Sequence, residues 1–238
     1  MKARKIKPNL RAVYDSVEAH LRWMSNCVAA DGDSAKELQR IQAEPDPVLK
    51  MIEEAAERDD PEEILGLLDN QWELAFVADN IEWLQALGKY ETCLVEAYTG
   101  TRTNNTHWPV PVLKLLFGYA DRGRLLAAGE PLPPGDTFTL YRGVAGDGSM
   151  RRPSGPSWTS NLDVAKWFAL RVPHLADPAI YSANVRRDDV LFYSNERGED
   201  DFVLFVNRPK RMPLDLKGQE NAGPLGEVLK RGGDNPSR

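Results

Sequence analysis

The sequence has 238 residues, which is enough for one large domain or two small ones. Hydrophobic residues make up 42% and charged residues 28%, and these globular values argue against a wholly disordered chain. The formal net charge is −6. No apolar run approaches the roughly 18 residues that cross a bilayer, so we expect no membrane segment.

Cysteine and histidine usage gives no sign of a disulfide framework or a metal site. Cys27 and Cys93 lie in helix-like stretches and form no CxxC pair, and the three histidines are scattered. The basic residues near Met1 are not followed by an apolar core, so the N-terminus does not resemble a secretory signal. We therefore expect a protein of a reducing compartment, the cytoplasm, with no bound metal.

Charge is unevenly distributed. Residues 31–86 hold 16 acids and 4 bases, a local charge of −12, which leaves +6 for the rest of the chain. A solvated acidic helical face explains this more simply than a binding surface for a protein partner, and both interpretations stay open. The basic remainder tolerates an anionic ligand. The sequence has no continuous basic stretch with interleaved aromatic residues, so it does not predict nucleic-acid binding.

The first half of the chain has helical periodicity. From Leu10 to Val28 apolar residues follow one helical face. Asp46-Pro47 and Asp60-Pro61 each place an N-cap acid before a proline suited to the first turn. Glu63 stands at the capping-box position after Asp60.

Two further helical patterns follow, one over 74–87 that ends at Gly88 and one from Trp108 to Gly129. The polar stretch Thr99–Thr106 between them is the best candidate for a domain boundary. We therefore predict three regions, a helical part over 1–105, a second domain over 106–218 and a Gly- and Pro-rich flexible tail over 219–238.

After Pro131 the pattern becomes that of strands. One short amphipathic helix is predicted over 163–171. The predicted strands are 137–144, 180–185, 190–193 and 202–206. The sequence therefore predicts an α+β protein, with a helical N-terminal region followed by a mostly antiparallel sheet.

The first chemical signal is Tyr141-Arg142-Gly143, which places an arginine inside an apolar strand. Burying an arginine is costly unless it meets an anion, and its planar fork suits a phosphate or a carboxylate. Gly143 would let the backbone approach a ligand closely. A structural carboxylate is the competing explanation for Arg142.

The second signal is Ser157-Trp158-Thr159, where alternate hydroxyls project to one face of an extended segment. They can orient a ribose or a neighbouring carboxylate. Ser160 or Asp163 is expected to cap the helix that follows.

The third signal is a run of acids from Glu196 to Asp201, in a turn that opens onto an apolar strand. Such a run is usually a solvated hairpin tip. Held at a sheet edge, however, Glu199 and Asp201 would suit the stabilisation of a positive transition state.

In order and spacing these three signals resemble the mono-ADP-ribosyltransferases of the Arg–Ser–Glu type, over roughly residues 137–207. Arg142 resembles the motif arginine and Ser157-Trp158-Thr159 the Ser-Thr-Ser motif, with Ala165 of the next helix eight residues on. Glu199-Asp200-Asp201 resembles the Glu-x-Glu turn. The resemblance implies the split, mostly antiparallel sheet of that family in a catalytic domain over 106–218.

The resemblance also implies roles for these residues. Arg142 would hold the diphosphate of NAD, and Ser157 would position the acid and the nicotinamide ribose. Asp201 would stabilise the oxocarbenium-like centre, while Glu199 would deprotonate the acceptor. The residues expected around NAD are Tyr141, Arg142, Gly143, Ser157, Trp158, Thr159, Phe168 and Tyr181, and Trp158, Tyr181 or Tyr193 would stack on the nicotinamide.

Two positions depart from the family pattern. Trp158 replaces the middle threonine. Asp201 stands at the place of the catalytic glutamate and is one methylene shorter, and an alternative register makes Glu199 the main catalytic acid.

The implied activity is NAD-dependent transfer of ADP-ribose to a macromolecule, typical of a toxin- or effector-like protein of a phage or mobile element. An arginine side chain of a protein is the favoured acceptor, and a nucleic acid is the other. No GxGxxG occurs, so NAD would not bind in the Rossmann manner. The competing functions are an NAD glycohydrolase and an impaired, non-enzymatic interaction module.

Overall fold

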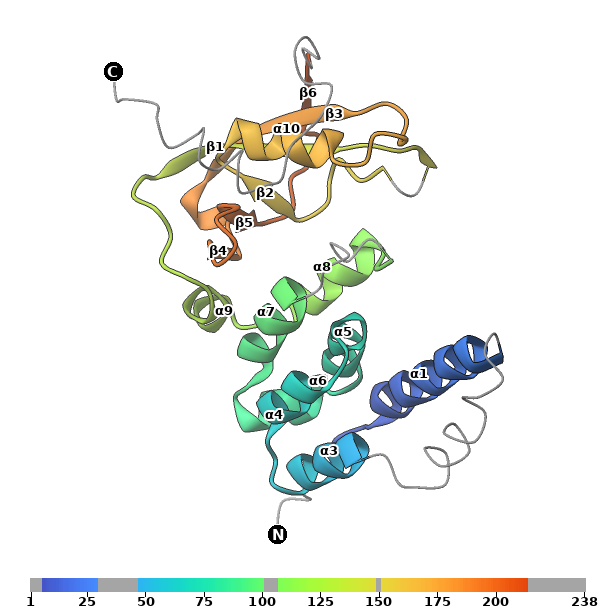
Figure 1. Cartoon of the computed structure of the whole chain (residues 1–238). Helices are drawn as coiled ribbons and strands as arrows, with labels where there is room; N and C mark the ends of the chain where they lie inside the picture. Colours follow the sequence, from blue (N-terminus) through green and yellow to red (C-terminus); the bar gives the residue numbers. More distant parts are fainter. Residues whose placement is uncertain (1–5, 30–46, 101–106, 149–150, 214–238) are drawn as a thin grey trace. The chain divides into compact units, whose positions relative to one another are not determined.

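The computed structural model describes residues 6–29, 47–100, 107–148 and 151–213, so the predicted tail lies outside the described residues. The chain divides into two compact units, residues 1–105 and 106–238. The first is helical, and the second combines helices with an antiparallel sheet (Figure 1). The predicted α+β class is confirmed.

Unit 1 is built on apolar helix faces. Its core includes the fully buried side chains of Ile64, Phe76 and Leu94. Gly88 ends α6 in the left-handed conformation, with φ 69°, as predicted for a C-cap. The helices are α1 (Arg11–Ala29), α3 (Pro47–Glu57), α4 (Pro61–Leu67), α5 (Asn70–Asp79), α6 (Ile81–Leu87) and α7 (Tyr90–Gly100).

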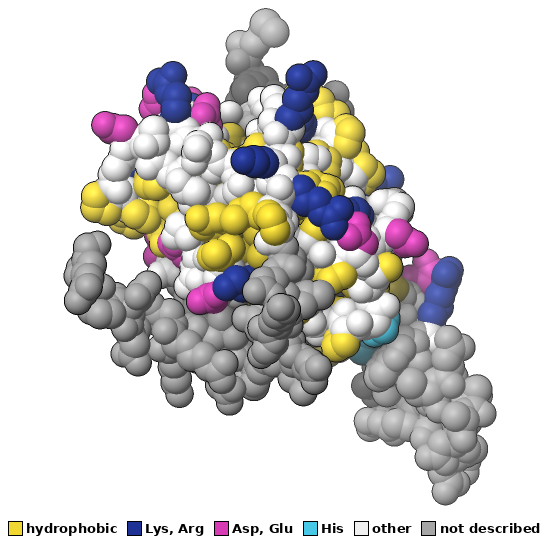
Figure 2. Space-filling view, turned by 90° about the horizontal axis from the view of Figure 1, so that it is seen from above, with side chains coloured by type: hydrophobic (Ala, Val, Ile, Leu, Met, Phe, Trp, Pro, Cys, Tyr) yellow, Lys and Arg dark blue, Asp and Glu magenta, His cyan; other side chains and the backbone are white. Residues whose placement is uncertain are grey.

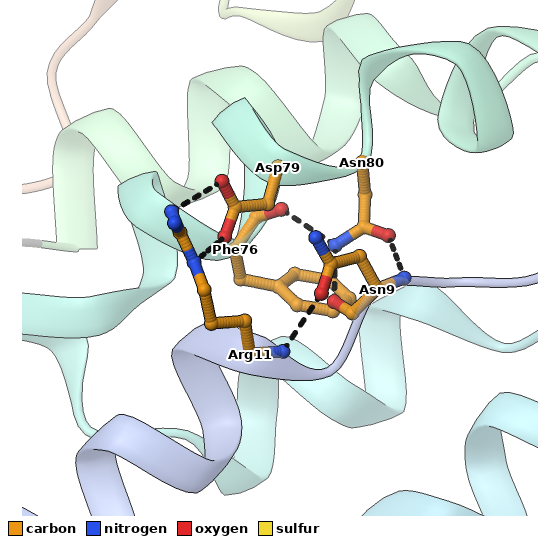
Figure 3. Close-up of polar contacts among 5 residues, drawn as sticks. All are labelled: Asn9, Arg11, Phe76, Asp79 and Asn80. Carbon is orange, nitrogen blue, oxygen red and sulfur yellow. Dashed lines mark hydrogen bonds and ion pairs between the residues drawn. The ribbon is translucent and has the colours of Figure 1, made fainter.

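The pattern predicted as one helix over 74–87 is two helices, because Asn80 interrupts it (Figure 3). Asn80 is buried, and its Nδ2 donates to the carbonyl oxygens of Phe76 and Asn9, both at 2.8 Å. The Asn9 N–H donates to Asn80 Oδ1 at 2.6 Å. The side chain thus takes the Phe76 carbonyl that a continuing helix would use. An ion pair between Arg11 and Asp79 also joins the start of α1 to the end of α5.

The capping box at the start of α4 is only half formed. Asp60 accepts from the Glu63 N–H at 3.1 Å, as predicted. The Glu63 side chain instead pairs with Arg58, and the Asp60 N–H donates to the carbonyl of Ala55.

Unit 2 begins with α8 (Val110–Gly118) and α9 (Arg122–Ala128), which the sequence had joined into one helix. Asp121 starts the second helix by accepting from the Arg124 N–H at 2.9 Å. The strands are β1 (Thr137–Val144), β2 (Ser157–Thr159), β3 (Ala179–Arg186), β4 (Phe192–Ser194), β5 (Asp201–Val203) and β6 (Lys210–Met212), with α10 (Leu162–Leu170) between β2 and β3.

The described strands form one sheet in the order β4-β5-β2-β1-β3-β6, with every pairing antiparallel. β1 pairs with β3 along its whole length, but it meets β2 at one register pair, Tyr141 opposite Thr159. The sheet is therefore two three-stranded halves joined at that pair. β6 was not predicted.

Helix α10 packs on the sheet, mainly on β1 (Figure 1). A Cβ at Gly143 would lie 1.9 Å from the Ala165 carbonyl oxygen and 2.7 Å from the Ala169 nitrogen. The close packing of this helix therefore explains Gly143, and the predicted approach of a ligand is not needed to account for it. No helix among the described residues is both long and apolar enough to traverse a bilayer.

Candidate active site

Arg142 of β1 is held by backbone carbonyl groups. Its Nε donates to the Arg152 oxygen at 2.9 Å, and its Nη1 donates to the Ser157 oxygen. The guanidinium also lies against Gly155, where a Cβ would be 2.4 Å from Nη2. Arg142 thus shapes the segment that leads into β2.

Ser157 and Asp201 meet across the paired strands β2 and β5. The Asp201 carboxylate accepts hydrogen bonds from the Ser157 hydroxyl and the Trp158 backbone N–H. The positive charge of Arg142 lies close enough to lower the pKa of this carboxylate. The structure therefore brings together three of the predicted catalytic residues, Arg142, Ser157 and Asp201.

Burial nevertheless outweighs these stabilising contacts and raises the pKa of Asp201 to about 7, with a further contribution from the negative charge of Glu199. Burial likewise raises the pKa of Glu199, against the positive charges of Arg197 and Arg171. Two interacting acids with raised pKa values are a frequent property of catalytic sites. Both predicted acids therefore belong to one electrostatic cluster.

Arg171 is a member of this cluster that the sequence analysis missed. Its guanidinium carbon lies 4.8 Å from the ring centre of Phe168 and 5.5 Å from that of Trp167, within cation–π range. Its positive charge acts to lower the pKa of Glu199. An arginine directly after α10 matches no sequence motif. The aromatic residues Trp167 and Phe168 close by are the one feature of the sequence that could have pointed to it.

Several residues predicted to contact NAD are occupied otherwise. Trp158 is 1% exposed, packs in the core with Leu140 and Phe202, and donates to the Gly155 carbonyl at 2.9 Å. It cannot stack on a nicotinamide ring. Thr159 is also buried, and its hydroxyl accepts from the Asn161 N–H at 3.0 Å.

The cap of α10 differs from the prediction as well. Asn161, not Ser160 or Asp163, is the N-cap, because its side chain accepts from the backbone N–H groups of Asp163 and Val164. Ser160 is left to donate to Asp200.

The remaining aromatic candidates lie at different places. Tyr181 of β3 is half-buried opposite Arg142, with Arg151 6.0 Å from its ring centre. Tyr141 is half-buried opposite Thr159. Tyr193 is buried and donates to Asp200, so it is not available for stacking. Tyr141, Phe168 and Tyr181 are partly exposed residues.

The described residues contain no group of three or more His, Cys, Asp or Glu side chains placed to hold a metal ion. Figure 2 shows a face on which lysine and arginine side chains lie beside apolar ones, with acidic side chains among them. Comparison of the chain with protein-family models, curated proteins and solved structures finds no significant match.

Proposed function

We propose that the chain is an NAD-dependent mono-ADP-ribosyltransferase. The observation that carries this proposal is the contact of Ser157 and Asp201 beside Arg142, with Glu199 coupled to the same carboxylate. Together they put a hydroxyl, a guanidinium and the acid Asp201 on neighbouring strands of one antiparallel sheet, with Glu199 in the turn just before β5. NAD offers a matching set of groups, namely ribose hydroxyls, a diphosphate and a cationic nicotinamide ring.

In this reaction the bond between the ribose carbon and the nicotinamide nitrogen breaks, and its electron pair leaves with nicotinamide. The sugar becomes oxocarbenium-like, as in glycoside hydrolysis. Ionised Asp201, oriented by Ser157, stabilises that charge, and the loss of one such group typically costs about 10² to 10³ in rate. The cationic ring of NAD favours the ionised form of Asp201.

The acceptor then forms a bond to the ribose carbon and gives up its proton. Glu199 is the base for that step, because burial raises its pKa above the ordinary value and brings it nearer to neutral pH. The diphosphate meets the positive charges of Arg142 and Arg171. A protein arginine is the favoured acceptor and a nucleic acid the other candidate.

The test is incubation of the protein with labelled NAD and a cell extract. Label on an acceptor that is lost in Asp201→Asn and kept in Glu196→Gln, an exposed acid in the same turn, supports the proposal. Release of ADP-ribose without a labelled acceptor identifies an NAD glycohydrolase instead. If the wild type neither binds nor consumes NAD, the enzyme assignment fails and a non-enzymatic interaction module remains.

A further inference from the structure

The carboxylate of Asp200, the residue between the two acids, accepts hydrogen bonds from two hydroxyl groups. The Tyr193 hydroxyl donates to its Oδ1 at 2.6 Å, and the Ser160 hydroxyl donates to its Oδ2. Its backbone N–H donates to Asn195 Oδ1 at 3.1 Å. None of these contacts is made by Glu199 or Asp201.

The position of Asp200 in the sheet explains the pattern. Asp201, the first residue of β5, pairs with Thr159 on one side and with Ser194 on the other. Asp200 precedes it, beyond the end of the backbone pairing and next to Ser160 and Asn195. Its side chain and N–H continue the connection to both neighbouring strands.

The backbone at Asp200 also ends the strand. Asp200 has φ 56°, in the left-handed region, so the strand cannot continue through it. Strand alternation therefore does not set the orientation of Glu199 relative to Asp201.

The anchors on the β4 side are themselves fixed. Tyr193 is 6% exposed, and its ring centre lies 4.9 Å from that of Phe202. Its carbonyl accepts from the Glu130 N–H at 2.8 Å, and Glu130 Oε1 accepts from the Asn195 N–H at 2.8 Å. The turn is thus attached to the buried core and to the chain that follows α9.

We propose that Asp200 is a positioning residue, which holds Glu199 and Asp201 in their reactive arrangement by tying the turn between them to β2 and β4. The proposal rests on the proposed function, since it assigns Asp200 a part in that same site. In this assignment Asp200 acts through the turn, and not by contact with the substrate.

The variants separate the side chain from the backbone. Asp200→Gly removes the carboxylate but keeps the left-handed conformation, which glycine adopts without penalty. Asp200→Asn also tolerates this conformation and retains an oxygen acceptor. Arg208→Gly is the matched control, because Arg208 is exposed in the same unit and has φ 58°.

We expect Asp200→Gly to lower kcat for NAD consumption by about tenfold to a hundredfold with little change in KM, since a displacement of about 1 Å suffices for such a loss. Asp200→Asn should restore most of the rate, and Arg208→Gly should match the wild type. Tyr193→Phe should lower kcat alone but add nothing to Asp200→Gly. An unchanged kcat in Asp200→Gly overturns the proposal.

A second measurement does not depend on activity. Carboxyl ¹³C titration follows Asp201, which faces Glu199, Arg142, the Ser157 hydroxyl and the Trp158 N–H. A loosened turn admits water, so Asp200→Gly should move the midpoint of Asp201 toward that of an ordinary aspartate, and Asp200→Asn should reverse the change. If the wild type consumes no NAD, the proposed function fails, and an unmoved Asp201 midpoint then overturns this inference separately.

Discussion

The guanidinium of Arg142 and the backbone of Gly155 are in direct contact, with no room for a side chain between them. The glycine has no left-handed φ, so space and not backbone conformation explains it. The same guanidinium donates to the carbonyl oxygens on either side, at Arg152 and Ser157. The segment 152–157 therefore wraps around one charged group.

Gly155→Ala should displace Arg142 and disturb Ser157 while leaving the fold intact, because the guanidinium is the flexible end of a side chain and can move. We expect NAD consumption to fall by about tenfold to a hundredfold, with a thermal midpoint close to that of the wild type. Gly118→Ala, where a Cβ meets nothing within 4 Å, is the control. Full activity in Gly155→Ala would show that Arg142 need not be held there.

Activity should rise with pH through about 7, because the raised pKa of Asp201 leaves it partly protonated below that value and the ionised form is the active one. The measurement is kcat/KM for NAD hydrolysis from about pH 5 to 9, which reports groups of the free enzyme. A profile that is flat over this range would contradict the assignment of Asp201.

Glu199→Gln should shift that midpoint to lower pH, since it removes a negative charge that raises the pKa of Asp201. It should also reduce labelling of the acceptor more than NAD hydrolysis. Glu196→Gln, at an exposed position, should leave both unchanged. A shift to higher pH in Glu199→Gln would mean that the two acids do not interact as described.

Gly143→Ala should unfold unit 2 or separate α10 from β1, because the added Cβ would lie 1.9 Å from a helix carbonyl oxygen. We expect a large fall in the thermal midpoint or insoluble protein. A stably folded variant that fails only to bind NAD would restore the ligand-approach role predicted from the sequence.

Glu73 of α5 in unit 1 provides a test of stability. Its Oε2 is buried and has no hydrogen-bond partner among the residues that the structure describes. Burial, with smaller contributions from Glu96 and Asp69, raises the pKa of Glu73 to about 7. Because the folded pKa exceeds the unfolded value, ionised Glu73 costs stability as the pH rises from about 4.5 through 7.

Glu73→Gln should therefore increase the free energy of unfolding above pH 7 by roughly 1–3 kcal/mol, since one pKa unit corresponds to about 1.4 kcal/mol. At acid pH the variant and the wild type should be alike. Denaturant unfolding at both pH values measures this, with the exposed Glu82→Gln as control. An equal effect at both pH values would exclude ionisation as the cause.

The sequence predicted the elements whose periodicity is local. The strand predicted over 137–144 is β1 to the residue, and the helix predicted from Leu10 is α1. It failed where a tertiary contact overrides the pattern, as at Asn80, whose buried side chain breaks a continuous apolar face. β6 has only three residues, two of them basic, and no apolar alternation marks it as a strand.

For the candidate site, the order of the three motifs sufficed to single out Arg142, Ser157 and the acidic turn. It did not reveal that Arg142 binds backbone oxygens, because the course of the chain between Arg142 and Ser157 decides that. Nor did it distinguish Trp158 in the core from a ring facing a ligand, since strand alternation alone gives two opposite faces without naming them. The contacts of Asp200 could not be predicted, because its partners Ser160 and Tyr193 lie far from it in the sequence or on another strand.

The buried side chain of Trp158 links the position of β2 to the packing of the hydrophobic core. An anchor of that size, between Ser157 and Thr159 and bonded to Gly155, leaves β2 little freedom to shift without the hydrophobic interior shifting too. Anyone who grafts this constellation onto another scaffold would have to transplant the tryptophan's surroundings with it. Substitutions in the core around Trp158 would, for the same reason, displace Ser157 and change the activity of the site.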